Sequence, residues 1–152
     1  MMRGKRIVSA IGPVLLLMGA GTGCAAGQAP VDELPSYSSL EDARQAVFDH
    51  LECREELLGS TVVFGSDGPM STESVKCTPT VELFYFDSQE ARTDTYAVMA
   101  DAAESGGSVY FAEGRNWFVV DYSEVEVGSA NPVPIDLSVL SESLGTRFTE
   151  VK

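Results

Sequence analysis

Positively charged residues are scarce in this sequence, and their scarcity argues against anionic binding partners. The 152-residue chain has 23 Asp and Glu residues but only 10 Lys and Arg, which gives a formal net charge of −13. Such a surface repels phosphate backbones and anionic lipid head groups. Nucleic-acid binding and electrostatic adhesion to membranes are therefore strongly disfavoured, and the dispersed acidic charge is typical of a solvated surface.

Histidine and recognisable chemical motifs are also lacking. His50 is the only histidine, which excludes metal sites built from several histidines and proton relays that need a second imidazole. The sequence contains no GxGxxG, P-loop, HExxH or EF-hand pattern. Carboxylates must lie close together somewhere, for example around Asp121, Glu124 and Glu126, but their spacing does not distinguish a catalytic pair or a calcium site from surface charge. We therefore predict no catalytic residue, no metal ligand and no cofactor.

Long hydrophobic runs are missing from the chain except near its beginning. Residues 7–18 form an apolar stretch of about a dozen residues, which is shorter than the roughly 20 residues that span a bilayer as a helix. It follows Arg3, Lys5 and Arg6 and precedes five small residues and Cys24. This order of a basic, an apolar and a small-residue segment is typical of a signal peptide, here residues 1–23.

The residues Gly21-Thr22-Gly23-Cys24 resemble the lipobox of bacterial lipoproteins, in which small residues precede the cysteine that receives the lipid. The resemblance covers the first 24 residues. It implies that Cys24 becomes the lipidated N-terminus and that the protein is anchored on the extracytoplasmic side of the cytoplasmic membrane. In the alternative, an ordinary signal peptidase cleaves after Ala26 and releases a soluble secreted protein.

The segment that follows, residues 24–39, is small, polar and proline-containing. This composition predicts a flexible tether with a root-mean-square reach of about 20 Å. Residues 40–152 would then form the folded domain. Removal of the signal peptide leaves 7 basic against 23 acidic residues, a net charge of −16.

Cysteine is rare, and its three positions predict a disulfide. Lipidation consumes Cys24 and the alternative cleavage discards it, so Cys53 and Cys77 remain as a pair in an exported protein. A bond between them would join the first helix to an edge strand and, by closing a loop of about 25 residues, stabilise the fold by roughly 3 kcal/mol. A redox role is disfavoured because the chain has no Cys-x-x-Cys.

Aromatic residues are concentrated in residues 81–122, which hold nine of the 13 in the chain. Their pattern predicts a central strand, a helix that begins near Asp87 and a hairpin whose loop contains Gly114. The flanking sequence predicts further elements: a helix at 40–58, a strand at 61–64, a turn at 65–69, an edge strand at 71–78, a helix at 136–144 and a last strand at 146–151. We expect a single α+β domain with a mainly antiparallel sheet and about three helices packed chiefly on one face.

Both faces of the predicted central strands are apolar. Either the last helix and the tether cover the second face, or an aromatic surface remains open. In the open case the candidate binding residues combine apolar area with a polar tip: Tyr85, Tyr110, Trp117 and Tyr122.

The two polar residues on the apolar face of the first predicted helix are His50 and Arg54, and we interpret His50 as a packing residue. The first hypothesis for function is a non-enzymatic binding or accessory protein, with the membrane reached through the lipid on Cys24 and the protein or small-molecule partner unspecified. The alternative is a soluble secreted enzyme that uses carboxylates of a surface cleft or His50.

Overall fold

The computed structural model describes residues 28–53, 63–65, 68–70, 73–125 and 131–152. Its three α-helices are α1 (Leu40–Phe48), α2 (Gln89–Asp101) and α3 (Val139–Leu144), and 3-10 turns cover Val31–Glu33 and Ala102–Ser105. The strands are β1 (Val63–Gly65), β2 (Gly68–Met70), β3 (Glu73–Thr78), β4 (Val81–Tyr85), β5 (Val109–Glu113), β6 (Trp117–Asp121) and β7 (Arg147–Val151). Among these described elements, no helix is long and apolar enough to cross a membrane.

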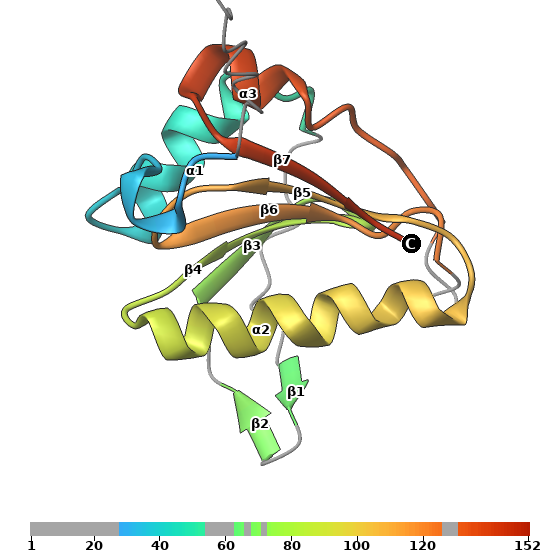
Figure 1. Ribbon diagram of the computed structural model, residues 1–152. Helices are drawn as coiled ribbons and strands as arrows, with labels where there is room; N and C mark the ends of the chain where they lie inside the picture. The colour runs from blue at the N-terminus through green and yellow to red at the C-terminus, as the bar shows by residue number, and fades with distance from the viewer. Residues whose placement is uncertain (1–27, 54–62, 66–67, 71–72, 126–130) are drawn as a thin grey trace, which may run out of the picture.

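Five strands form one sheet in the order β3-β4-β6-β5-β7, and every neighbouring pair is antiparallel. The chain leaves β4, passes through α2 and enters β5, and β6 then returns between them, so that β4 and β5 run parallel on either side of β6 (Figure 1). The edge strands are β3, as predicted from its polar pattern, and β7. The β1–β2 pair is separate, with Gly65 opposite Gly68 where the sequence predicted a turn.

Both faces of the sheet are covered, because alternate side chains of the central strands are apolar in both directions. Val81, Leu83, Trp117 and Val119 pack beneath α1 and α3 on one face, here called the α1/α3 face. On the opposite face, the α2 face, the strands contribute Phe84, Phe111, Phe118 and Val120. Figure 1 shows α2 on this side of the sheet, with β1 and β2 beyond it.

The single α+β domain with an antiparallel sheet and three helices is confirmed. Two of the three helices share a face, as predicted, and α2, the longest of them, covers the other. Burial of aromatic rings on both sides requires cover on both sides, and the doubly covered sheet is the outcome that the structure shows.

The first helix is shorter than predicted. Ser39 caps α1 by accepting a hydrogen bond from the Asp42 amide at 3.1 Å, and the helix ends at Phe48 instead of continuing to residue 58. His50 therefore lies beyond the helix and is exposed, so its interpretation as a packing residue on an apolar helix face is wrong. Arg54 lies outside the described residues. The end of α3 agrees with the prediction, since Gly145 adopts a left-handed conformation with φ 69°.

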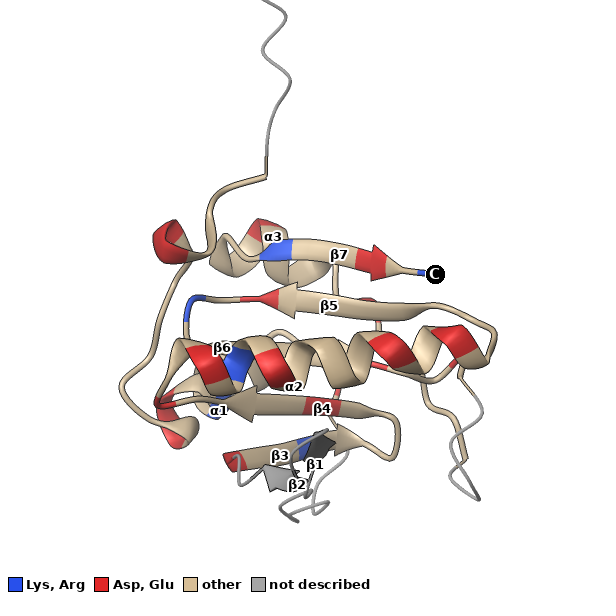
Figure 2. Ribbon diagram, turned by 60° about the horizontal axis from the view of Figure 1, so that its bottom comes forward, with Lys and Arg blue, Asp and Glu red and all other residues tan. Residues whose placement is uncertain are grey.

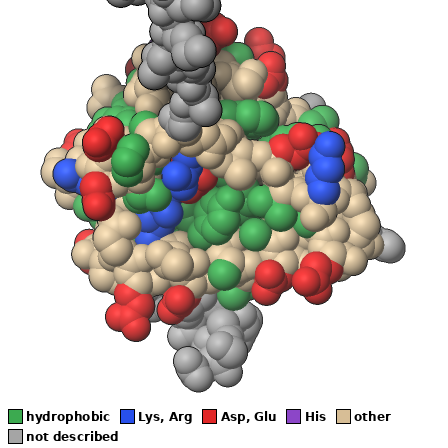
Figure 3. All heavy atoms as spheres, viewed as in Figure 1, with side chains coloured by type: hydrophobic (Ala, Val, Ile, Leu, Met, Phe, Trp, Pro, Cys, Tyr) green, Lys and Arg blue, Asp and Glu red, His purple; other side chains and the backbone are tan. Residues whose placement is uncertain are grey.

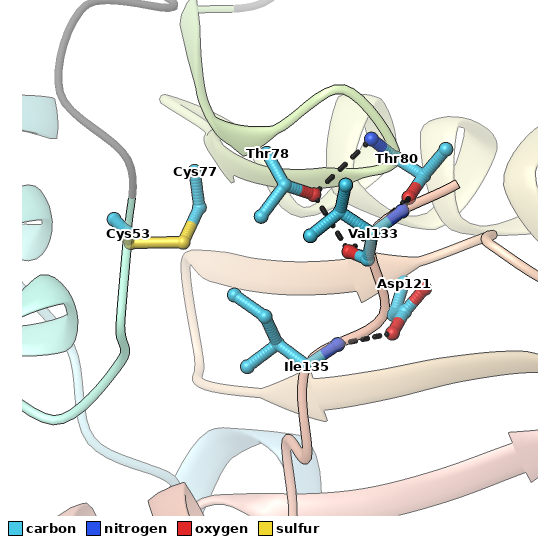
Figure 4. The surroundings of a disulfide bond; sticks show 7 residues. All are labelled: Cys53, Cys77, Thr78, Thr80, Asp121, Val133 and Ile135. Carbon is cyan, nitrogen blue, oxygen red and sulfur yellow. Dashed lines mark hydrogen bonds between the residues drawn. A yellow bond between two sulfur atoms is a disulfide. The ribbon is translucent and has the colours of Figure 1, made fainter. Parts of the chain in front are cut away.

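The disulfide between Cys53 and Cys77 is confirmed, with the Cα atoms 4.6 Å apart. It attaches the segment after α1 to the edge strand β3, and Cys77 is completely buried (Figure 4). The pairing agrees with the elimination argument, in which these two cysteines are the only ones left in the processed chain.

The predicted tether is partly incorporated into the domain. Leu34 is buried at 5% exposure, and the Pro35 carbonyl accepts hydrogen bonds from the Arg115 amide at 2.8 Å and from the Trp117 indole at 3.1 Å. The prediction of a flexible segment up to residue 39 is therefore wrong from Leu34 onward. Composition alone missed it, because the partner atoms lie about 80 residues further along the chain.

Candidate functional site

The α1/α3 face contains a hollow of about 360 Å³ near the end of the sheet where β5 begins and β6 ends. Its lining comes from four parts of the sequence that the fold brings together: Tyr110, Asp121, Ser123, Glu124, Pro134, Ile135, Asp136, Leu137 and Phe148. A volume of a few hundred Å³ is the size of a small-molecule site.

One wall of the hollow, residues 134–137, is an irregular segment held in place by threonine side chains. The Thr78 hydroxyl donates to the Val133 carbonyl at 2.9 Å, and the Val133 amide donates to the Thr80 hydroxyl at 3.0 Å (Figure 4). Thr78 and Thr80 are themselves buried at the turn between β3 and β4. The disulfide fixes Cys77 next to this turn, so the covalent link and the hydrogen bonds together set the position of the wall.

Asp121 holds the floor and the wall of the hollow together. Its carboxylate accepts hydrogen bonds from the Ser123 amide at 2.8 Å and from the Ile135 amide at 2.9 Å, one on each oxygen. The residue is only 2% exposed. Because both oxygens are engaged by backbone donors inside the protein, Asp121 is a structural carboxylate of the hollow, and ligand contact is left to its neighbours.

Two aromatic rings and two further carboxylates form the rest of the lining. The rings of Tyr110 and Phe148 are nearly parallel, with centroids 6.2 Å apart and an interplanar angle of 17°. The Tyr110 phenol donates to Glu124 at 2.8 Å; this hydrogen bond lowers the pKa of Glu124 and raises the pKa of Tyr110. Hydrogen bonds from Ser138 lower the pKa of Asp136. Both carboxylates are therefore anionic at neutral pH.

A second polar cluster lies on the α2 face, at the opposite end of β5. Glu113 is 1% exposed and receives Arg92 at 2.7 Å, Arg147 at 2.8 and 3.1 Å and the Thr149 hydroxyl at 3.0 Å. Burial by itself raises the pKa of Glu113, but the hydrogen bonds and charges of Arg147 and Arg92 outweigh it, and the pKa lies below its ordinary value. Arg92 also stacks over the Phe118 ring. All these contacts are internal, so we interpret the cluster as structural.

The distribution of charge and apolar area on the surface is uneven. Acidic residues are spread along the helices, while basic residues are few (Figure 2). Apolar side chains gather between β7 and α2 with basic side chains beside them (Figure 3).

The structure does not unite the four aromatic residues that the sequence suggested as a binding surface. Trp117 is completely buried and Tyr122 is 5% exposed, on the α1/α3 face and the α2 face respectively. The doubly covered sheet removes both from any open surface. Tyr85 and Tyr110 are partly buried on the α1/α3 face, and only Tyr110 lines the hollow.

Of the candidate catalytic groups of the alternative hypothesis, carboxylates of a surface hollow are brought together, since Asp121, Glu124 and Asp136 line it, but His50 does not join them. His50 is exposed after α1, and in the part of the chain that the structure describes no hydrogen bond or ion pair joins its side chain to a hydroxyl or a carboxylate. Within the same residues, no group of three His, Cys, Asp or Glu side chains could hold a metal ion. Glu126, named with Asp121 and Glu124 as a neighbouring acid, lies outside the described residues.

Sequence reasoning named three residues of the hollow and missed the others. Tyr110 was a candidate, and Asp121 and Glu124 were noted as neighbouring acids. Phe148 belongs to a weakly alternating last strand, and its spacing of two from Glu150 places both on one side of the strand. That alternation could have indicated which side of the strand Phe148 lies on. The sequence does not show that β7 pairs with β5, so it could not place Phe148 near Tyr110. No protein-family model, no curated protein and no solved structure matches the chain.

Proposed function

We propose that this chain is an exported bacterial lipoprotein, anchored through Cys24 on the outer side of the cytoplasmic membrane, whose domain binds a ligand and does not catalyse a reaction. The resemblance of residues 21–24 to a lipobox and the Cys53–Cys77 disulfide support export. The hollow beside Tyr110 supports binding.

The ligand class follows from the lining of the hollow. Two ionised carboxylates, Glu124 and Asp136, border a space walled by the Tyr110 and Phe148 rings and by the apolar Ile135. No lysine or arginine is among the described residues that line it, although the charge of nearby Lys152 acts on Glu124. Carboxylates attract a cation, and aromatic faces favour one whose charge is spread over an apolar body. The hollow is therefore suited to a small organic cation, such as an alkylated ammonium group, and this combination of rings and carboxylates is the observation that carries the proposal.

The proposal is tested by titrating the purified protein with tetramethylammonium, and with tert-butanol as a neutral probe of similar shape. We expect tetramethylammonium to bind and tert-butanol to bind far more weakly. Glu124→Gln should weaken binding of the cation, because the hollow then loses one of its two exposed carboxylate charges.

The matched control is Glu142→Gln, which removes the same charge from an exposed position on α3. It should leave the affinity unchanged, because Glu142 does not line the hollow. The overall negative charge falls by the same amount in both variants, which makes the control a matched one. Equal weakening in both variants would show that the cation binds the acidic surface in general. Mass analysis of the protein from membranes tests the anchor separately: an acyl group on Cys24 is expected, and its absence with all protein in the medium would mean ordinary secretion.

A further inference from the structure

Residues 34–37 and the β5–β6 loop, residues 114–116, form a contact that we call the clasp. The Pro35 carbonyl accepts two hydrogen bonds, from the Arg115 amide and from the Trp117 indole. The Asn116 side chain binds both backbone groups of Tyr37. The Tyr37 amide donates to the Asn116 side-chain oxygen at 3.1 Å, and the Asn116 side-chain nitrogen donates to the Tyr37 carbonyl at 2.8 Å. The N-terminal segment is thereby bound through its main chain, and the Ser36 hydroxyl adds a side-chain contact by accepting a hydrogen bond from Arg115 at 2.7 Å.

The clasp is closely packed around Gly114. A Cβ atom on Gly114 would lie 2.1 Å from the Trp117 indole nitrogen and 2.7 Å from the Pro35 carbonyl oxygen, so only glycine leaves room for both. Its φ is not in the left-handed region, so close approach, and not the turn conformation that the sequence suggested, explains this glycine. The Tyr37 ring also packs against Trp117, with centroids 5.4 Å apart.

The contacts continue toward the N-terminus along the edge strand β7. The Gln28 side chain donates to the Phe148 carbonyl at 3.4 Å, and Arg147 donates to the Ala29 carbonyl at 3.5 Å. Gln28 is four residues from Cys24, and four residues span at most about 14 Å when fully extended. A free tether up to the start of α1 would have a root-mean-square reach of about 20 Å and a far longer maximum.

We infer that, in the protein anchored through Cys24, the clasp holds the loop 114–116 and the start of β7 against the lipid head groups and so fixes which end of the domain faces the bilayer. This inference rests on the anchoring proposed above. Exposed Arg115 lies in this loop and exposed Asp32 and Glu33 lie in the N-terminal segment, so the covalent link at Cys24, and not a surface of one charge, sets the orientation.

Energy transfer from the single tryptophan tests this orientation, because Trp117 belongs to the clasp end. The chain from Cys24 onward is coupled through that cysteine to a maleimide lipid, in vesicles whose head groups carry dansyl. Cys24 is the only free thiol when Cys53 and Cys77 are bonded, and every described contact begins at Gln28 or later. Chemical coupling makes the result independent of lipidation in the cell, so failure of the proposed anchor and failure of this inference remain distinguishable.

We expect strong transfer in the wild type and a loss of roughly twofold or more in Asn116→Ala, as the reach of the released tether rises from about 14 Å to about 20 Å and beyond. Asn131→Ala is the matched control, since Asn131 is exposed in a loop outside the clasp. It should transfer as the wild type does. Transfer is corrected for any change in the quantum yield of Trp117.

Hydrogen exchange of the Arg115 amide shows whether the clasp has opened, because this amide is bonded to Pro35 in the closed form. If Asn116→Ala leaves that exchange slow, Leu34→Asp is used instead, which places a charge at a buried position of the same segment. Equal transfer in the wild type and in a variant with an open clasp would overturn the inference, as would a wild type with transfer as weak as that variant.

Discussion

The two ends of the β5–β6 hairpin differ in how their polar groups are used. At the loop end, residues 114–116, all three backbone carbonyls have partners inside the protein: the Arg92 side chain, the Gln89 side chain and the Phe86 amide. The N-terminal segment adds the clasp to the same loop. At the other end, Tyr110 and Asp121 border a hollow with ionised carboxylates on its rim.

One pair of strands therefore contributes to stability at its loop end and to binding at its other end. The loop end is where the N-terminal segment, the end of β4, the beginning of α2 and the edge strand β7 converge, so its contacts stabilise the fold. The hollow end has its wall fixed by Asp121, Thr78 and Thr80, which leaves Tyr110, Glu124 and Phe148 in place beside open space. Changes at the first end should therefore alter stability, and changes at the second should alter binding.

The largest loss of stability is expected from Glu113→Ala, close to the loop end. The substitution leaves Arg92, which is 4% exposed, without its carboxylate partner. Removal of one partner of a buried ion pair typically costs about 3 to 5 kcal/mol. Chemical denaturation measures this, with Glu142→Ala as the exposed control that should change stability by less than about 0.5 kcal/mol.

The same carboxylate gives a pH dependence with a definite sign. The pKa of Glu113 is lower in the folded protein than its ordinary value of 4.5, so its contribution to stability is complete above that value and is lost as the pH falls through the folded pKa. Glu113→Gln should remove this part of the acid sensitivity. An unchanged acid slope, or a Glu113→Ala protein as stable as the wild type, would show that the cluster does not stabilise the fold.

A smaller loss is expected from Gly114→Ala in the clasp. The added methyl group meets the Trp117 ring and the Pro35 carbonyl, so the indole and the N-terminal segment must move, at the cost of about 1 to 3 kcal/mol that is usual for overpacking. The shifted tryptophan should also become easier to quench with acrylamide. Gly106→Ala is an informative comparison: it has φ 96° but open space around its Cβ position, so it tests backbone strain without a collision. Wild-type stability and quenching in Gly114→Ala would contradict the close packing of the clasp.

The sequence predicted the elements of this fold where the signal is local. The runs that became β4, β5 and β6 are short, apolar and bounded by polar or glycine residues, and the disulfide follows from eliminating Cys24. The end of α1 was missed because apolar residues continue at helical spacing beyond Phe48, through Leu51. The spacing of apolar residues cannot show that Leu51 lies in an irregular segment while its side chain packs in the core.

The clasp and the hollow depend on long-range contacts, and this is why they escaped the sequence. Pro35 and Trp117 are 82 residues apart, and Ile135 reaches Asp121 across a separate loop. Trp117 was placed on a candidate open surface because both faces of its strand are apolar, and the sequence does not show that Tyr37 would pack against it. The fold class can thus be predicted from the hydrophobic pattern of the sequence. Which end of the β5–β6 hairpin carries the hollow can be determined only from the register of β7 on β5.

The most direct test of the difference between the two ends is a map of backbone amide chemical shifts during titration with tetramethylammonium. We expect the largest shifts at Tyr110, Ser123 and Ile135, around the hollow, while the amide shifts of residues 114–117 remain unchanged. Shifts that are largest in the loop 114–116, or that are spread evenly over the acidic surface, would contradict the assignment of binding to the Tyr110 end.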